Sequence, residues 1–301
     1  MLIGILTAIG TGLLWTVVGG AMSYCARAKI DFKSYYAVNM FLSALFTAAV
    51  YIRWNVVSSD LVGNLLPLVF VIGGAGLISA IGIIVMQSAM ARGHNGVIWA
   101  IGQSALIIPF LAGIVLFGEA CGFMRVLGLM LILLGMVLPV WSRRNRESSN
   151  SSGNGGSLWL KLALIAFVLF GIGQTFQSIP SYWTGWQDNA CLRPTLGCVG
   201  SFVGIVGSMI VFRSRLLLSR KMLLLALLMA AQSVLSIRLF YVAMDHLAAH
   251  GMGSIGFPMI VGSCIFGFSI YSIFILKEKC NISGWVALTL TVSGIFALST
   301  I

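Results

Sequence analysis

The sequence contains little charge and very little acid. Of 301 residues only 8% are charged, and just 7 are Asp or Glu, whereas 59% are hydrophobic. Soluble domains carry about 25% charged residues. A chain this apolar could not bury its hydrophobic surface in water. The composition therefore excludes a soluble globular domain and predicts a protein surrounded by lipid.

Several signatures of chemistry are also missing from the sequence. It has no clustered acids, no His-Cys spacing for zinc and no Gly-x-x-x-x-Gly-Lys loop, so we expect no enzyme activity, metal or cofactor. The net charge is +11, but the basic residues lie in short segments between apolar runs. That distribution is typical of membrane topology signals and not of a nucleic-acid surface. The expected partners are the bilayer and a small-molecule substrate, with protons as a candidate coupling ion, in a monomer or homodimer.

Continuous apolar runs predict an all-α polytopic membrane protein, because a lipid-facing β-barrel would alternate polar and apolar residues. A span needs about 20 apolar residues. Ten such spans are expected, at 3–25, 35–52, 65–91, 95–118, 122–141, 159–179, 195–213, 222–245, 252–276 and 284–300. We interpret the first as a span and not as a cleaved signal peptide, because no basic segment precedes it.

The region 94–139 recurs 159 residues later in the chain. Eight of 35 positions are identical at this offset, and both copies place a Glu between two apolar runs. The identical pairs are Ile101/Ile260, Ser104/Ser263, Ile114/Ile273, Glu119/Glu278, Cys121/Cys280, Leu129/Leu288, Leu131/Leu290 and Gly135/Gly294. Duplication is the better explanation. It predicts a five-helix repeat at 1–141, a polar linker at 142–158 and a second repeat at 159–301.

Because each repeat has an odd number of spans, the second must enter the membrane inverted relative to the first. The positive charges agree with this arrangement. Fourteen Lys or Arg residues lie in connections 1–2, 3–4, 5–6, 7–8 and 9–10, and three lie in the other four connections. The positive-inside rule then places the linker in the cytoplasm and both termini on the outer side of the cell (inner) membrane. The three outward residues are Arg53, Arg125 and Arg193.

Two stretches resemble the ten-span transporters of the drug/metabolite transporter superfamily, which includes EamA-like proteins. The matching residues are Phe117-Gly118-Glu119, Gly128 and Gly135 in the first half, and Leu276-Lys277-Glu278 and Gly294 in the second, where Ala287 replaces the usual second Gly. Basic residues between spans 1 and 2, together with Ile101-Gly102-Gln103-Ser104, are similar to the sugar branch, with its rhamnose–proton symporter and glucose-uptake proteins. The resemblance implies a carrier and favours a sugar.

Polar side chains within spans are costly, so they are the first candidates for function. Arg238, Tyr241 and Asp245 fall on one face of span 8. Arg238 and Tyr241 could bind substrate while Asp245 exchanges a proton. A purely structural Arg–Asp pair, or an Arg that reaches the headgroups, is the competing interpretation.

An aromatic ring beside an amide is a common way to bind a sugar. Trp99 and Gln103 lie one turn apart in span 4, span 6 adds Gln174 and Gln177, and span 1 adds Trp15. The alternative is that the tryptophans pack in the core and the amides bond neighbouring helices.

Other residues receive weaker roles. His94 and His250 precede spans 4 and 9, where they could couple protons or simply face water. Glu119 and Glu278 are expected at the N-termini of spans 5 and 10. Pro109 and Pro258 are expected to kink spans 4 and 9. Aromatic residues of the loop before span 7, Tyr182, Trp183 and Trp186, are expected to anchor at lipid headgroups.

Cys191 and Cys198 could form a disulfide in an oxidising compartment, although Cys198 is expected inside a helix. Taken together, the sequence predicts a secondary active transporter that carries a small polar metabolite, first a sugar, by alternating access. An EamA-type exporter of amino acids or other metabolites is the alternative. A membrane enzyme and a non-transporting sensor or scaffold are rivals of other classes.

Overall fold

The computed structural model describes residues 1–52, 65–92, 95–147, 158–183, 191–275 and 282–300, and the regular structure in these residues is helical. The α-helices are α1 (Leu2–Arg27), α2 (Phe32–Tyr51), α4 (Gly74–Met90), α5 (Asn95–Gln103), α6 (Ile107–Phe117), α7 (Phe123–Glu147), α8 (Leu158–Ser178), α9 (Arg193–Val211), α10 (Arg220–Ala248), α11 (Gly256–Phe274) and α12 (Ile282–Ser299). Short π or 3-10 segments are η2 (Val69–Gly73), η3 (Ser104–Leu106), η4 (Ile179–Tyr182) and η6 (Gly253–Ile255).

Eight helical stretches of the described residues are long and apolar enough to cross a membrane. This is the character of a polytopic membrane protein. The two predicted spans outside this set are α2 and α7. The apolar part of α7, Phe123–Leu138, is shorter than the others, and α2 carries the polar residues Asn39, Ser43 and Thr47 on its buried side.

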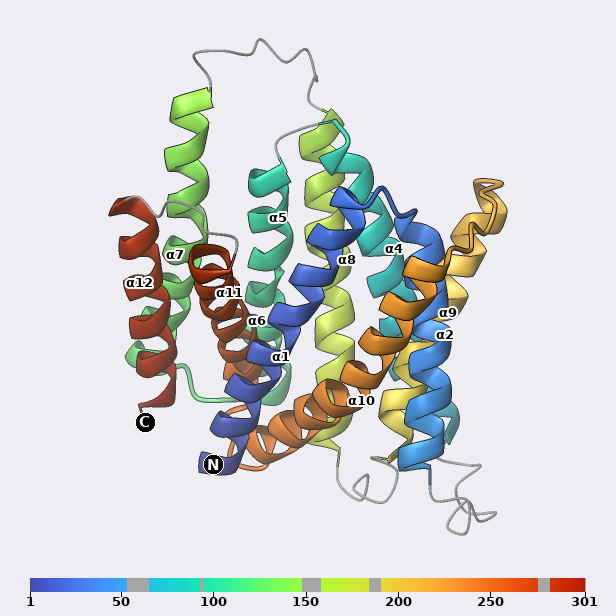
Figure 1. The fold of residues 1–301 in the computed structure, drawn as a ribbon. Coiled ribbons are helices and arrows are strands. Elements are labelled where there is room, and N and C mark those ends of the chain that lie inside the picture. Colours follow the sequence, from blue (N-terminus) through green and yellow to red (C-terminus); the bar gives the residue numbers. More distant parts are fainter. Residues whose placement is uncertain (53–64, 93–94, 148–157, 184–190, 276–281, 301) are drawn as a thin grey trace.

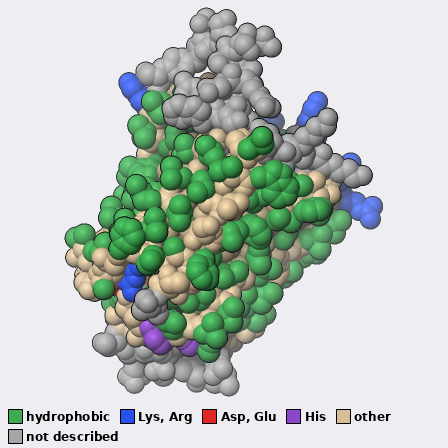
Figure 2. Space-filling model, turned by 90° about the vertical axis from the view of Figure 1, so that its left-hand side faces the viewer, with side chains coloured by type: hydrophobic (Ala, Val, Ile, Leu, Met, Phe, Trp, Pro, Cys, Tyr) green, Lys and Arg blue, Asp and Glu red, His purple; other side chains and the backbone are tan. Residues whose placement is uncertain are grey.

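On the face drawn in Figure 2, apolar side chains cover much of the middle of the molecule. Large hydrophobic residues such as Phe70, Val115 and Phe296 are each about 70% exposed. A surface of this kind is stable when lipid covers it. In Figure 2 most of the visible Lys and Arg side chains lie toward the upper end and His side chains lie near the lower end.

The helices run alternately up and down, and both chain ends lie at the lower end in Figure 1. We call this lower end the terminal end. The first helices of the two halves, α1 and α8, run in opposite directions, as do the last, α7 and α12 (Figure 1). Helices from the two halves are interleaved: α1 packs on α10 and α11, and α8 packs on α4, α5 and α6.

Glycines set the closest helix crossings. A Cβ on Gly128 of α7 would lie 2.7 Å from the carbonyl oxygen of Gly294 on α12, and a Cβ on Gly135 would lie 2.9 Å from that of Ala287. Gly76 of α4 makes a further close crossing, because a Cβ there would collide with the backbone of Gly197 in α9. Small residues at these points let the helix backbones approach closely.

The two prolines occupy similar local structures. Pro109 is the third residue of α6, directly after η3, and this 3-10 turn divides predicted span 4 into α5 and α6. The α-helical geometry is thus interrupted just before Pro109, and the kink itself stays a prediction. Pro258 is also the third residue of its helix, α11. A 3-10 turn, η6, likewise lies directly before this helix, and the kink at Pro258 stays a prediction.

Candidate functional site

The most deeply buried charge among the described residues is Arg193, the first residue of α9. It is only 1% exposed. Its Nη1 donates to Asp245 Oδ1 at 2.6 Å and to Ser181 Oγ at 3.2 Å, and its Nη2 donates to the Pro180 carbonyl oxygen at 3.2 Å. The guanidinium carbon lies 5.8 Å from the centroid of the Tyr241 ring. A buried arginine with this many partners is a specific structural feature and not a loop charge.

This ion pair corrects the sequence prediction for Asp245. Asp245 and Tyr241 do share a face of α10, but the cation beside them is Arg193 and not Arg238. Arg238 instead lies over the Tyr51 ring, 5.8 Å from its centroid. The partner was missed because periodicity relates residues of one helix, whereas Arg193 comes from a neighbouring helix.

Asp245 and Arg193 differ strongly in their access to solvent. The side chain of Asp245 is 34% exposed, whereas that of Arg193 is 2% exposed. Water can therefore hydrate the carboxylate but not the guanidinium. The Nε of Arg193 is buried without a hydrogen-bond partner in the described structure, so the guanidinium is bonded through its two terminal nitrogens alone.

Glu119 forms a second buried carboxylate site, in the turn between α6 and α7. Its Oε1 accepts from the backbone N–H of Gly253 at 2.6 Å, and its Oε2 accepts from that of Ser254 at 2.9 Å. Glu119 thus binds the N-terminal end of η6 and α11, where the helix dipole favours a negative charge. The sequence predicted Glu119 at the N-terminus of span 5; it does lie in the turn before α7, 3.9 Å from Arg125, but the helix start that its carboxylate binds is that of η6. The turn begins at Gly118, whose left-handed φ of 67° ends α6.

Tyr182 of η4 joins the two sites. Its hydroxyl donates to Glu119 Oε1 at 2.9 Å, and its ring stacks on Phe117 with a centroid distance of 3.7 Å. The expectation that Tyr182 anchors in lipid headgroups was therefore wrong. Trp186 lies outside the described residues. The same four-residue segment, η4, also supplies the Pro180 and Ser181 oxygens that bind Arg193.

The predicted aromatic and amide set is divided between two regions. Trp15 of α1 stacks on Phe240 with centroids 6.0 Å apart. Trp99 of α5 packs in a separate core cluster with residues of α4 and α8. Gln103, Gln174 and Gln177 are half-buried, and α8, which carries the last two, packs against α5 and η3. The Oε1 of Gln174 is buried and has no hydrogen-bond partner in the described structure.

The remaining candidates lie at the ends of helices. His250 is exposed: its Nε2 lies 3.2 Å from the N-terminal nitrogen of Met1, and its Nδ1 lies 2.7 Å from the His246 carbonyl oxygen. His94 and Glu278 lie outside the described residues. Cys198 is buried in α9, and neither Cys191 nor Cys198 is in a disulfide. In the described part of the chain, no three His, Cys, Asp or Glu residues are placed to hold a metal.

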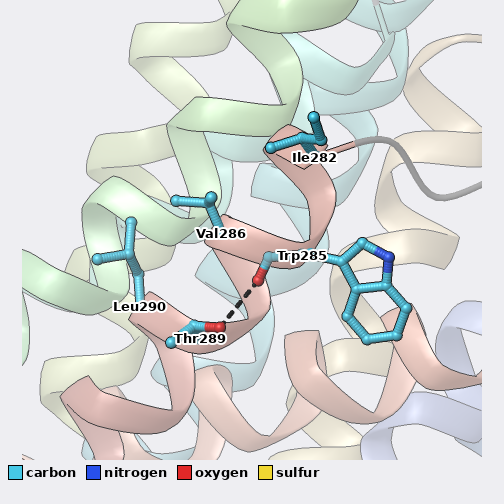
Figure 3. Close-up of a pocket in the computed structure, with 5 residues that line it drawn as sticks. All are labelled: Ile282, Trp285, Val286, Thr289 and Leu290. Atoms are coloured by element: carbon cyan, nitrogen blue, oxygen red, sulfur yellow. Dashed lines mark hydrogen bonds between the residues drawn. The ribbon is translucent and has the colours of Figure 1, made fainter.

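A shallow groove runs along the outer side of α12 (Figure 3). It is lined by Ile282, Trp285, Val286, Thr289 and Leu290. The Thr289 hydroxyl donates to the Trp285 carbonyl oxygen of its own helix at 3.1 Å, so the lining offers mainly apolar atoms. Such a surface suits acyl chains better than a polar substrate.

Comparison with known proteins gives the fold alone. No protein-family model matches the chain, and no curated protein matches it. A solved structure described only as "Crystal structure of protein" is similar over 98% of each chain, with a TM-score of 0.69 at 14% sequence identity. At this identity the similarity concerns the arrangement of helices and carries no activity or substrate.

Proposed function

We propose that the protein is a secondary active transporter with ten membrane spans in two inverted five-helix repeats. The substrate we propose is a small polar metabolite, first a sugar. The resemblance of the two Glu-containing stretches to drug/metabolite transporters is one support. The site adds another, because buried polar groups in lipid are costly and are typical of substrate and ion pathways.

The observation that carries the proposal is the pairing of α7 with α12. At the offset of 159, Gly128 corresponds to Ala287 and Gly135 to Gly294. The contact of Gly128 with Gly294 therefore becomes the contact of Ala287 with Gly135 when the halves are exchanged, and both contacts are present. An interface that is unchanged by this exchange is what a two-fold axis between repeats produces. Inverted repeats around a central site are a common plan of secondary transporters.

The residues divide into proposed roles. Gln174, with its unpartnered oxygen, accepts from a substrate hydroxyl, and Gln103, Gln177, Trp15 and Trp99 supply further amides and rings. Asp245 is the proposed proton carrier, because it is partly hydrated and its charge is balanced by one buried cation.

The test is transport by purified protein in proteoliposomes. Labelled sugars and amino acids are screened first by thermal shift, since a ligand that binds the native state raises its stability. We expect at least one sugar to stabilise the protein and to accumulate under an imposed proton gradient, and accumulation to stop when a protonophore is added. Uptake of amino acids alone would favour the exporter alternative. Binding without movement across the membrane would indicate a sensor.

A further inference from the structure

The terminal end of the bundle contains a continuous polar chain that includes residues of both halves. Arg193 and Asp245 lie in α9 and α10, whereas Glu119 lies in the turn between α6 and α7. Between them lies η4, which binds Arg193 through Pro180 and Ser181 and binds Glu119 through Tyr182. Glu119 in turn holds the start of α11 through two backbone N–H groups.

We infer that Arg193 and Tyr182 are positioning residues of the carrier, which latch the terminal end shut through η4 under the control of Asp245. This inference rests on the carrier function proposed above. It assigns the structure to the state in which the terminal end is closed. Opening this end requires η4 to break its contacts with Arg193, with Glu119, or with both.

The difference in burial identifies Asp245 as the control point. The Asp245 side chain is partly exposed, whereas Arg193 is buried and bonded to η4 and α10. A change at Asp245 is thus transmitted through Arg193 to Pro180 and Ser181. Removing the negative charge leaves an uncompensated buried cation, which is a strongly unfavourable state. The guanidinium can then regain solvation only if it moves together with η4.

Two features allow such a latch to open. The Arg193 Nε has no partner in the described structure, so the closed state leaves one buried donor unsatisfied, at a cost in free energy. Gly253 leaves room for the Tyr182 hydroxyl, because a Cβ at this position would collide with that group. The contact of Tyr182 with Glu119 therefore requires a residue without a side chain at position 253. For the same reason the Tyr182 ring can move away without displacing a side chain there.

The experiment uses a native reporter. Cys198 in α9 is 3% exposed and lies five residues after Arg193. In full-length protein with Cys25, Cys121, Cys191, Cys264 and Cys280 changed to Ser, a water-soluble maleimide is added to protein in lipid nanodiscs. We expect slow labelling with Asp245 intact, and labelling about tenfold faster in Asp245→Asn and Arg193→Gln, because the open population rises.

The matched control is Lys33→Gln at the opposite end, where Lys33 lies over the Phe212 ring. It should label within about twofold of the parent protein. Tyr182→Phe retains the ring that stacks on Phe117 and loses only the hydroxyl. If Tyr182 and Asp245 act through the same segment, η4, the double variant Tyr182→Phe/Asp245→Asn should label more slowly than the product of the two single-variant accelerations predicts.

Unchanged labelling in both Asp245→Asn and Arg193→Gln overturns the latch, as does equal acceleration by Lys33→Gln. If the labelling rate of the double variant equals the product of the accelerations by Tyr182→Phe and Asp245→Asn, the coupling through η4 is overturned. Labelling requires no substrate, so a failed transport screen counts against the carrier proposal and leaves the labelling result intact. Normal transport with unchanged labelling counts against the latch alone.

Discussion

Gly128 of α7 and Gly294 of α12 lie so close that a Cβ on either one would be 2.7 Å from the carbonyl oxygen of the other. This mutual contact joins the last helices of the two halves. It leaves no room for a side chain at either position.

Substitution of Gly128 by Ala should therefore separate α7 from α12. Overpacking of a closely packed contact costs about 1–3 kcal/mol, which exceeds the gain in helix propensity that Ala brings. We expect a lower midpoint of thermal unfolding in detergent. Gly207→Ala is the control, because nothing lies within 4 Å of a Cβ there. It should be neutral or stabilising by up to about 1 kcal/mol, and equal losses in both variants would contradict this account of the crossing.

The Arg193–Asp245 pair predicts an asymmetric effect of removing its two charges. Asp245→Asn leaves the buried guanidinium uncompensated and should cost about 3 kcal/mol of folding stability. Arg193→Gln leaves a carboxylate that is already 34% exposed, so water can hydrate it and the loss should be smaller, about 1–2 kcal/mol. Thermal unfolding of both variants measures the difference. The reverse order of stability would show that the guanidinium is not the more buried partner.

The sequence predicted the helices, because apolar runs depend on local composition alone. The site was predicted only in part. Asp245 and Tyr241 were found by their polarity within an apolar span, but their partner Arg193 was assigned to a loop.

The same limitation explains why the contacts of Glu119 and Tyr182 were missed. Glu119 binds N–H groups 134 and 135 residues away, and Tyr182 contacts a residue 63 positions away. Such contacts depend on how the helices pack, and no periodicity within one segment encodes them. A buried role could have been suspected from Glu119, because it is one of only 7 acids in an apolar chain.

The unpartnered oxygen of Gln174 predicts a separation of binding from stability. Gln174→Leu removes a buried acceptor that lacks a donor in the described structure. The free energy of unfolding should therefore be unchanged or higher by about 1 kcal/mol. The thermal shift produced by the substrate should nevertheless disappear. Thr175→Val is the matched control on α8, since the Thr175 hydroxyl bonds the Gly171 carbonyl oxygen of its own helix. Loss of the shift in both variants would point to a general disturbance of α8.

The proposed orientation predicts which cysteines react from outside the cell. Cys121 is exposed in the turn between α6 and α7 at the terminal end, and Arg215 is exposed in the loop before α10 at the opposite end. In the proposed orientation, the side with the excess of positive charge, which includes Arg215, faces the cytoplasm. A single-cysteine protein that retains Cys121 should react with an impermeant maleimide in intact cells. A single-cysteine Arg215→Cys protein should react only after the cells are opened, and the opposite pattern would invert the topology of the whole bundle.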